Sequence, residues 1–270
     1  MRRISLEDDM TQPGSPTWMD LGTDDVEGAK AFYTALFGWD FLDQGPDFGG
    51  YLMIKQGDGF VGGAMSSKMT PEGPVDEPQF PTSWTIYLRV EDIDAALAKV
   101  EPQGGSVMVP AMEVGDAGRM AVVTAADGAV VGLWQPKDFE GYDFTGQPGS
   151  PVWFETMSKD YDAAAAFYTE VFGWTITPMG QIPEGQPRYA TNGEGSAASA
   201  GICEATTFLP DGVPSYWRMY LAVEDCDAAA AKVQELDGTL LDGPMDSPFG
   251  RLATVTDPQG GMFQVIKPSF

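Results

Sequence analysis

An internal repeat constrains this chain more than any other feature. Residues 14–20, Gly-Ser-Pro-Thr-Trp-Met-Asp, recur as Gly-Ser-Pro-Val-Trp-Phe-Glu at 149–155, a shift of 135. Residues 32–39, Phe-Tyr-Thr-Ala-Leu-Phe-Gly-Trp, return at the same shift at 167–174, with six of eight residues identical. Self-similarity of this length and order indicates that the chain contains two homologous halves.

Two further segments carry the repeat to the end of each half. Residues 88–96 recur at 221–229, and Gly-Arg-Met-Ala at 118–121 recurs as Gly-Arg-Leu-Ala at 250–253. The shift falls to 132 by the last segment, so the deletions lie in loops. A stretch rich in Asp, Gly, Pro and Gln joins the halves and is typical of a linker. We therefore expect a disordered N-terminal extension at 1–12, domains at 13–136 and 148–270, and a linker at 137–147.

A fainter repeat divides each half again. Residues 23–29 resemble 90–96, and in both places a short apolar run leads into an acidic helix start. Asp24 and Glu27 have capping-box spacing. The helix that follows is expected to bury one face, made of Val26, Ala29, Tyr33 and Leu36. Three strand-like runs come next, at 39–42, 51–55 and 60–65. Each quarter is therefore predicted to have the order βαβββ.

The composition excludes several functions. The chain has no histidine, which rules out Ser-His-Asp and Cys-His catalysis and HExxH zinc sites. A formal charge of −25 argues against binding to nucleic acid or to an anionic membrane surface. Cys203 and Cys226 are too few for a disulfide framework and are interpreted as small buried residues. This usage is typical of a cytoplasmic protein.

The order of these motifs resembles that of the vicinal-oxygen-chelate family, which contains glyoxalase I, bleomycin-resistance proteins and extradiol dioxygenases. The resemblance rests on the motifs at 32–39 and 90–96, on their repeats, and on Asp-Pro-Gln-Gly at 257–260, and it spans nearly the whole chain after Thr11. The matching turn at 125–128 lacks the Asp-Pro. The resemblance implies an α+β fold of four βαβββ modules paired into two domains. Each domain would be an open sheet curled into a cup that holds the ligand.

Metal-using members of this family carry His, Gln or Glu ligands on the first strand of each module and near the end of the last strand. The resemblance places those positions at Trp18, Thr85 and Gly132 in the first domain. In the second domain they fall on Trp153, Arg218 and Gln264. Trp, Thr and Gly are poor ligands for divalent metals, and Arg repels a cation. We therefore expect no metal and no cofactor.

Strand alternation predicts which side chains face the cups. Asp20 and Tyr87 would face the first cup, and Glu155 and Tyr220 the second. Either acid could act as a general acid or base in an apolar cup, and either tyrosine could donate a hydrogen bond to a developing oxyanion. Alternatively, the acids anchor nearby backbone or pair with an arginine such as Arg218.

Further residues are candidates for ligand contact, because aromatic and polar side chains suit an organic ligand. These are Trp18, Thr85, Arg119, Trp153, Arg218, Arg251 and Gln264. For the two tryptophans the alternative is packing in the core. For Arg119 and Arg251 it is a position at a sheet edge.

The sequence leaves two functions open. The first is a metal-free binding protein for a small organic molecule, with no nucleic-acid or membrane partner, as a monomer or weak homodimer. The second is a metal-independent isomerase, lyase or hydroxylase-like enzyme that uses a cup carboxylate as its acid or base. A glyoxalase-type lyase is a third interpretation, and it conflicts with the missing metal ligands.

Overall fold

The computed structural model describes residues 12–45, 48–70, 72–143, 146–180 and 185–269. The first quarter contains β1 (Pro16–Thr23), α1 (Val26–Phe37), β2 (Asp40–Asp43), β3 (Leu52–Gln56) and β4 (Gly59–Ser66). A short ribbon of β5 (Met69–Thr70) and β6 (Gly73–Pro74) follows. The second quarter contains β7 (Ser83–Arg89), α2 (Ile93–Val100), β8 (Ser106–Val114), β9 (Gly118–Thr124) and β10 (Val130–Pro136). The expected N-terminal extension lies outside the described residues except for Gln12.

The second half of the chain repeats this order. Its third quarter contains β11 (Pro151–Ser158), α3 (Tyr161–Phe172), β12 (Thr177–Pro178), β13 (Tyr189–Thr191), the 3-10 turn η2 (Gly195–Ala197) and β14 (Ala200–Glu204). Its fourth contains β15 (Tyr216–Ala222), α4 (Cys226–Glu235), β16 (Thr239–Ser247), β17 (Gly250–Thr256) and β18 (Met262–Pro268). The predicted succession of βαβββ modules is confirmed.

The strands form two eight-stranded mixed sheets. Their orders are β2-β3-β4-β1-β7-β10-β9-β8 and β12-β13-β14-β11-β15-β18-β17-β16. Within every module the first strand pairs in parallel with the last, as β1 does with β4 and β15 with β18. Each sheet thus contains two modules, and the α+β fold of open curled sheets is confirmed.

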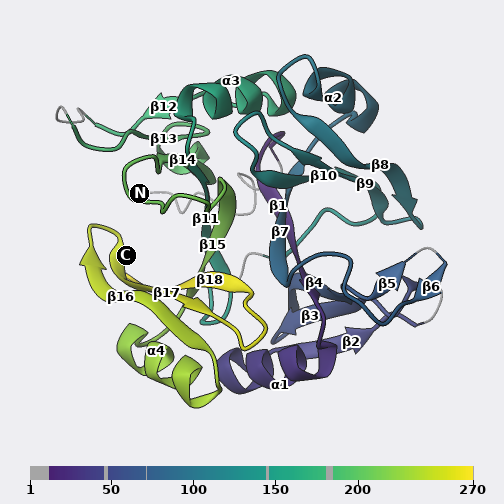
Figure 1. Cartoon of the computed structure of the whole chain (residues 1–270), viewed down its shortest axis with the longest axis vertical. Helices are drawn as coiled ribbons and strands as arrows, with labels where there is room; N and C mark the ends of the chain where they lie inside the picture. Colours follow the sequence, from purple (N-terminus) through teal and green to yellow (C-terminus); the bar gives the residue numbers. More distant parts are fainter. Residues whose placement is uncertain (1–11, 46–47, 71, 144–145, 181–184, 270) are drawn as a thin grey trace. The chain divides into compact units, whose positions relative to one another are not determined.

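The chain divides into two compact units, each of which draws on both halves of the sequence. Unit 1 comprises residues 1–18, 86–141 and 154–218, and unit 2 comprises residues 19–85, 142–153 and 219–270. In unit 1, α2 lies beside α3, and in unit 2, α1 lies beside α4 (Figure 1).

The cap of α1 differs from the predicted one. Asp25, not Asp24, is the N-cap, and its carboxylate accepts a hydrogen bond from the backbone N–H of Gly28 at 2.9 Å. The capping-box prediction was therefore wrong by one residue. The predicted buried face of the helix is confirmed in part: Ala29 and Tyr33 are buried together with Phe32, whereas Val26 and Leu36 are only half-buried.

The helix side of each unit contains a buried polar chain. In unit 2 the indole of Trp84 donates to the hydroxyl of Tyr33 at 3.0 Å, and that hydroxyl donates to Asp257 at 2.9 Å. In unit 1 the indole of Trp217 donates in the same way to Tyr168 at 2.7 Å. Buried polar groups need such partners, so these chains hold the helices in place on their strands.

Among the described residues, no helix has both the length and the apolar character that crossing a bilayer requires.

Candidate functional site

The strands present two different faces. In β17 and β18, Ala253, Val255, Phe263 and Val265 are fully buried, on strands that α4 contacts. Thr254 and Gln264 alternate with them and therefore point to the opposite face. We call the face opposite the helices the concave face of the sheet.

Asp20 lies on the concave face of β1, in unit 2, and is 7% exposed. The hydroxyl of Tyr51 donates a hydrogen bond to Asp20 Oδ1 at 2.5 Å. Gly63 on β4 stands opposite Asp20, and a Cβ atom there would lie 1.7 Å from the Tyr51 oxygen. The phenol of Tyr51 therefore crosses directly over Gly63 to reach Asp20. Only a glycine at position 63 leaves room for this ring.

Glu155 occupies the corresponding position on β11, in unit 1, with the side chain 5% exposed. Arg218 Nε donates to Glu155 Oε1 at 2.7 Å, and a second guanidinium N–H donates to the same oxygen. A buried carboxylate requires a partner of this kind, since an isolated buried charge is very costly. The charges of Arg218 and Glu155 therefore compensate each other.

Three further side chains surround this ion pair. Burial raises the pKa of Cys203 to about 12, and the Glu155 charge adds to the rise, so the thiol is protonated at neutral pH. Burial also raises the pKa of Tyr216, against the opposing effect of Arg218. The hydroxyl of Tyr189 lies over Gly201, where a Cβ atom would be 2.2 Å from it.

Tyr51 and Tyr189 are site residues that sequence reasoning missed. Tyr51 directly precedes β3 and Tyr189 begins β13, the strands that pair with the glycine strands β4 and β14. Each tyrosine covers a glycine, Gly63 or Gly201, that stands opposite the acid. The two tyrosines and the two glycines recur at one common shift of 138, since 189 − 51 and 201 − 63 are equal. That shared spacing was the available signal.

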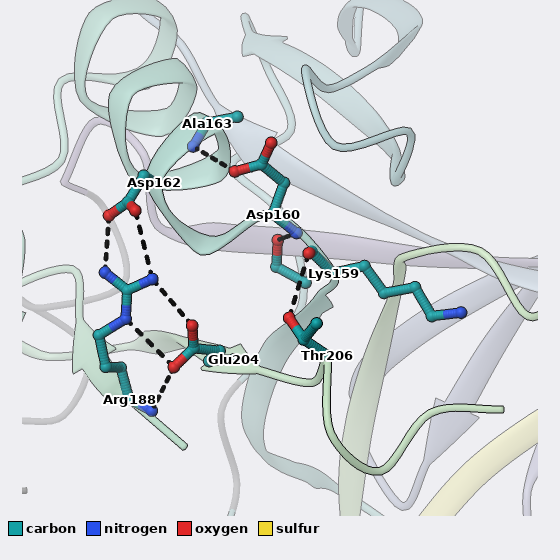
Figure 2. Close-up of polar contacts among 8 residues, drawn as sticks. Lys159, Asp160, Asp162, Ala163, Arg188, Glu204 and Thr206 are labelled. Carbon is teal, nitrogen blue, oxygen red and sulfur yellow. Dashed lines mark hydrogen bonds and ion pairs between the residues drawn. The ribbon is translucent and has the colours of Figure 1, made fainter. Parts of the chain in front are cut away.

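Arg188, the residue before Tyr189 in the sequence, is the centre of an ionic cluster in unit 1. Figure 2 shows the Arg188 guanidinium between Asp162 and Glu204, with contacts of 2.7 and 2.8 Å. The same guanidinium lies over the ring of Tyr161, 4.2 Å from its centroid. These contacts join the start of α3 to β13 and β14, and so help to place Tyr189.

Tyr87 and Tyr220, the predicted oxyanion donors, are both buried, on the first strands of the second and fourth modules, β7 and β15. Tyr87 lies over Gly132, where a Cβ atom would be 2.1 Å from its ring. Tyr220 instead stands opposite Gln264, which is fully buried. The two tyrosines therefore have different neighbours.

Three further candidates for ligand contact are Trp18, Thr85 and Trp153, and they differ in burial. Trp18 is 5% exposed, and its ring packs edge-on against Phe139 at a centroid distance of 5.0 Å. Thr85 and Trp153 are half-buried on β7 and β11. Trp18 therefore packs against another aromatic ring within unit 1.

Arg119 and Arg251 lie on the helix face of their strands. Arg119 contacts Asp94 in the first turn of α2 at 2.8 Å, and Arg251 contacts Asp227 in the first turn of α4 at 2.6 Å. Each shares its strand face with the buried residues under the helix, such as Ala253. The structure therefore does not bring these arginines together with the concave-face residues.

The residues that the resemblance places at metal-ligand positions are a poor set of donors for a divalent ion. They are Trp18, Thr85 and Gly132 in one half and Trp153, Arg218 and Gln264 in the other. Within the part of the chain that the structure describes, no group of three or more His, Cys, Asp or Glu side chains could hold a metal. This donor set lacks the carboxylates, thiolates and imidazoles that divalent metals prefer.

Comparisons with known proteins agree with this fold. The family model described as "Glyoxalase/Bleomycin resistance protein/Dioxygenase superfamily" matches twice, at residues 16–133 and 151–265. "Putative glyoxylase CFP32" of Mycobacterium tuberculosis is 40% identical over 259 residues, covering 95% of each chain. "Anthracycline biosynthesis protein DauV" of Streptomyces sp. strain C5 is 34% identical over 262 residues, covering 94% of each chain.

Solved structures show the same architecture at low sequence identity. The 2,3-dioxygenase LapB from Pseudomonas sp. KL28 has a TM-score of 0.64 at 13% identity, covering 96% of this chain and 94% of its own. The Mn(II)-bound glyoxalase from Novosphingobium aromaticivorans has a TM-score of 0.62 at 16% identity, covering 95% and 82%. With both halves matched by the family model and relatives this similar along their full length, the chain belongs to the glyoxalase/bleomycin resistance protein/dioxygenase superfamily.

Proposed function

We propose that this protein binds a small, oxygen-bearing organic molecule on the concave face of its sheets, and that it does so without a metal ion. The observation that carries the proposal is the Arg218–Glu155 pair. The guanidinium of Arg218, which the resemblance assigns to a metal-ligand position, is hydrogen-bonded to a buried acid. A cation fixed in this way repels a metal but favours an acceptor oxygen of an organic ligand.

The surroundings of the pair suit an aromatic ligand. Arg218 remains 19% exposed, so the guanidinium can be reached, and Tyr216 beside it is half-buried. Aromatic side chains with a few oriented polar groups are typical of sites for planar organic molecules. The name of the Streptomyces relative, which refers to anthracycline biosynthesis, favours polycyclic aromatic ligands as the first class to test.

Quinizarin sulfonate, a soluble hydroxylated anthraquinone, is a suitable probe, with binding followed by quenching of tryptophan fluorescence and by calorimetry. The double variant Arg218→Met/Glu155→Gln removes the guanidinium without leaving a bare buried charge. It is expected to lose at least about tenfold in affinity, the effect of one charge-assisted hydrogen bond. Arg251→Met, on the helix face, is the matched control and should bind normally.

Two results would overturn the proposal. One is undiminished binding by the double variant. The other is binding that appears only after addition of Mn²⁺, Fe²⁺, Ni²⁺ or Zn²⁺ and disappears with a chelator. Turnover of the glutathione hemithioacetal of methylglyoxal that depends on an added metal would likewise replace this proposal with a glyoxalase-type lyase.

A second function, metal-independent acid–base catalysis, is favoured by one observation, the Asp20–Tyr51 contact. Asp20 is 7% exposed and accepts a hydrogen bond from a phenol that is fixed over Gly63. A positioned carboxylate of this kind can exchange a proton with a carbon acid. The test is deuterium incorporation into a bound ketone, followed by NMR. Exchange that Asp20→Asn abolishes while binding persists would establish the enzyme, and no exchange with wild type would exclude it for that ligand.

A further inference from the structure

A row of polar side chains crosses the concave face of unit 2. Tyr220 stands opposite Gln264, Gln264 opposite Thr254, and Thr254 opposite Asp242. Residues that oppose one another in neighbouring strands lie on one face of the sheet, so these four side chains form a line across β15, β18, β17 and β16. We call this line the polar row. It runs from the exposed Asp242 through the half-buried Thr254 to the fully buried Gln264.

Gln264 has a fixed amide with an unused donor. Its Oε1 accepts a hydrogen bond from the hydroxyl of Thr254 at 2.9 Å. Its Nε2 is buried, and among the described residues it has no hydrogen-bond partner. A buried donor without an acceptor destabilises a fold by about 1–3 kcal/mol, so proteins seldom retain one without a use. An acceptor oxygen of a ligand would satisfy this group.

The first half of the sequence provides a matched row with different chemistry. In unit 1, Tyr87 stands opposite Gly132, Gly132 opposite Val122, and Val122 opposite Val109. The backbone arrangement is the same, but beyond the tyrosine no side chain in this row can form a hydrogen bond. The ring of Tyr87 also fills the space over Gly132. Beyond Tyr87, this row, which we call the apolar row, has no side chain that could bind an oxygen atom as the polar row can.

We infer that the polar row is a specificity-determining surface of unit 2, and that it selects organic ligands that carry carbonyl and hydroxyl oxygens along one edge. Gln264 Nε2 donates to a carbonyl or phenolic oxygen, and Thr254 and Asp242 accept from hydroxyl groups nearer the rim. The apolar row takes no part in recognising these oxygens. This inference rests on the proposed binding function and names the chemistry that the site selects.

The test compares two ligands of equal charge, quinizarin sulfonate and anthracene sulfonate, which lacks the quinone and hydroxyl oxygens. Gln264→Met keeps the side-chain volume and removes the amide, Thr254→Val removes the hydroxyl, and Asp242→Asn probes the exposed end, where folding is least at risk. Val122→Thr, in the apolar row, is the matched control. Calorimetric affinities and thermal midpoints are measured for every variant.

Gln264→Met and Thr254→Val are each expected to weaken binding of quinizarin sulfonate by about two- to tenfold, the effect of one neutral hydrogen bond, and to leave anthracene sulfonate unchanged. Asp242→Asn should weaken it less, and Val122→Thr should have no effect. Equal losses for both ligands, or no loss for either, would overturn the inference while the binding function stands. If wild type binds neither ligand, the proposed function fails, and the inference fails with it.

Discussion

The indole nitrogen of Trp39 donates a hydrogen bond to the carbonyl oxygen of Gly149 at 2.9 Å, across 110 residues of chain. Trp174 does the same to Gly14 at 2.7 Å. Each tryptophan ends the aromatic motif of one half, and each glycine begins the Gly-Ser-Pro motif of the other. The two motifs are therefore complementary parts of one contact, which explains why both recur in each half of the chain.

Trp39→Phe should destabilise the protein by about 1–3 kcal/mol, because the Gly149 carbonyl loses its buried donor. Urea unfolding followed by circular dichroism measures the change. Phe48→Leu, at a side chain that is 51% exposed, is the control and should change the free energy of unfolding by less than about 0.5 kcal/mol. Equal stability of Trp39→Phe and wild type would show that the contact contributes nothing.

The Arg218–Glu155 pair should show strong coupling in a double-mutant cycle. Arg218→Met alone leaves a carboxylate with a side chain only 5% exposed without its cation, and we expect a loss of about 3 kcal/mol. Adding Glu155→Gln removes the buried charge and should recover most of that loss. Additive effects of the two substitutions on chemical denaturation would contradict the pairing.

Gly132→Ala tests the close approach of Tyr87. The new methyl group would lie 2.1 Å from the ring, so the tyrosine must move, and overpacking of this kind costs about 1–3 kcal/mol. In the background of Tyr87→Ala, where the ring is absent, the same substitution should be nearly neutral. Thermal denaturation of the four proteins separates these outcomes, and an equal penalty in both backgrounds would place the strain elsewhere.

Asp257 should make stability depend on pH. Burial raises the pKa of its carboxyl above the ordinary 3.8, despite hydrogen bonds from the Gly261 N–H and the Tyr33 hydroxyl. A group with a raised folded pKa favours folding most below its unfolded pKa, and this contribution is lost as pH rises through the folded value. Asp257→Asn removes the titration.

The thermal midpoint of wild type relative to Asp257→Asn should therefore fall as pH rises above about 3.8 and then level off. Differential scanning calorimetry from acid to neutral pH gives both curves. The other carboxyl groups titrate equally in the two proteins, so they cancel in the difference. Parallel curves across this range would mean that burial does not shift the pKa of Asp257.

The sequence alone determined the modules and their order. The apolar alternation and the repeated motifs are local patterns, and a strand or helix forms wherever its own residues favour it. Those patterns located the strand that carries Asp20 and the strand that carries Glu155. They also left open whether Glu155 pairs with Arg218, because side chains 63 residues apart meet only through the sheet.

Only the tertiary structure decided which residues from distant modules meet. Tyr33 hydrogen-bonds to Asp257 in the last quarter of the chain, 224 residues away, although the first half has its own turn acid, Asp127. Likewise, Tyr51 reaches Asp20, and the hydroxyl of Thr254 orients the amide of Gln264, through strand registers that no local pattern specifies. Register is set by how whole strands pack against the core, so these contacts depend on the complete sheet rather than on the residues nearest to them in sequence.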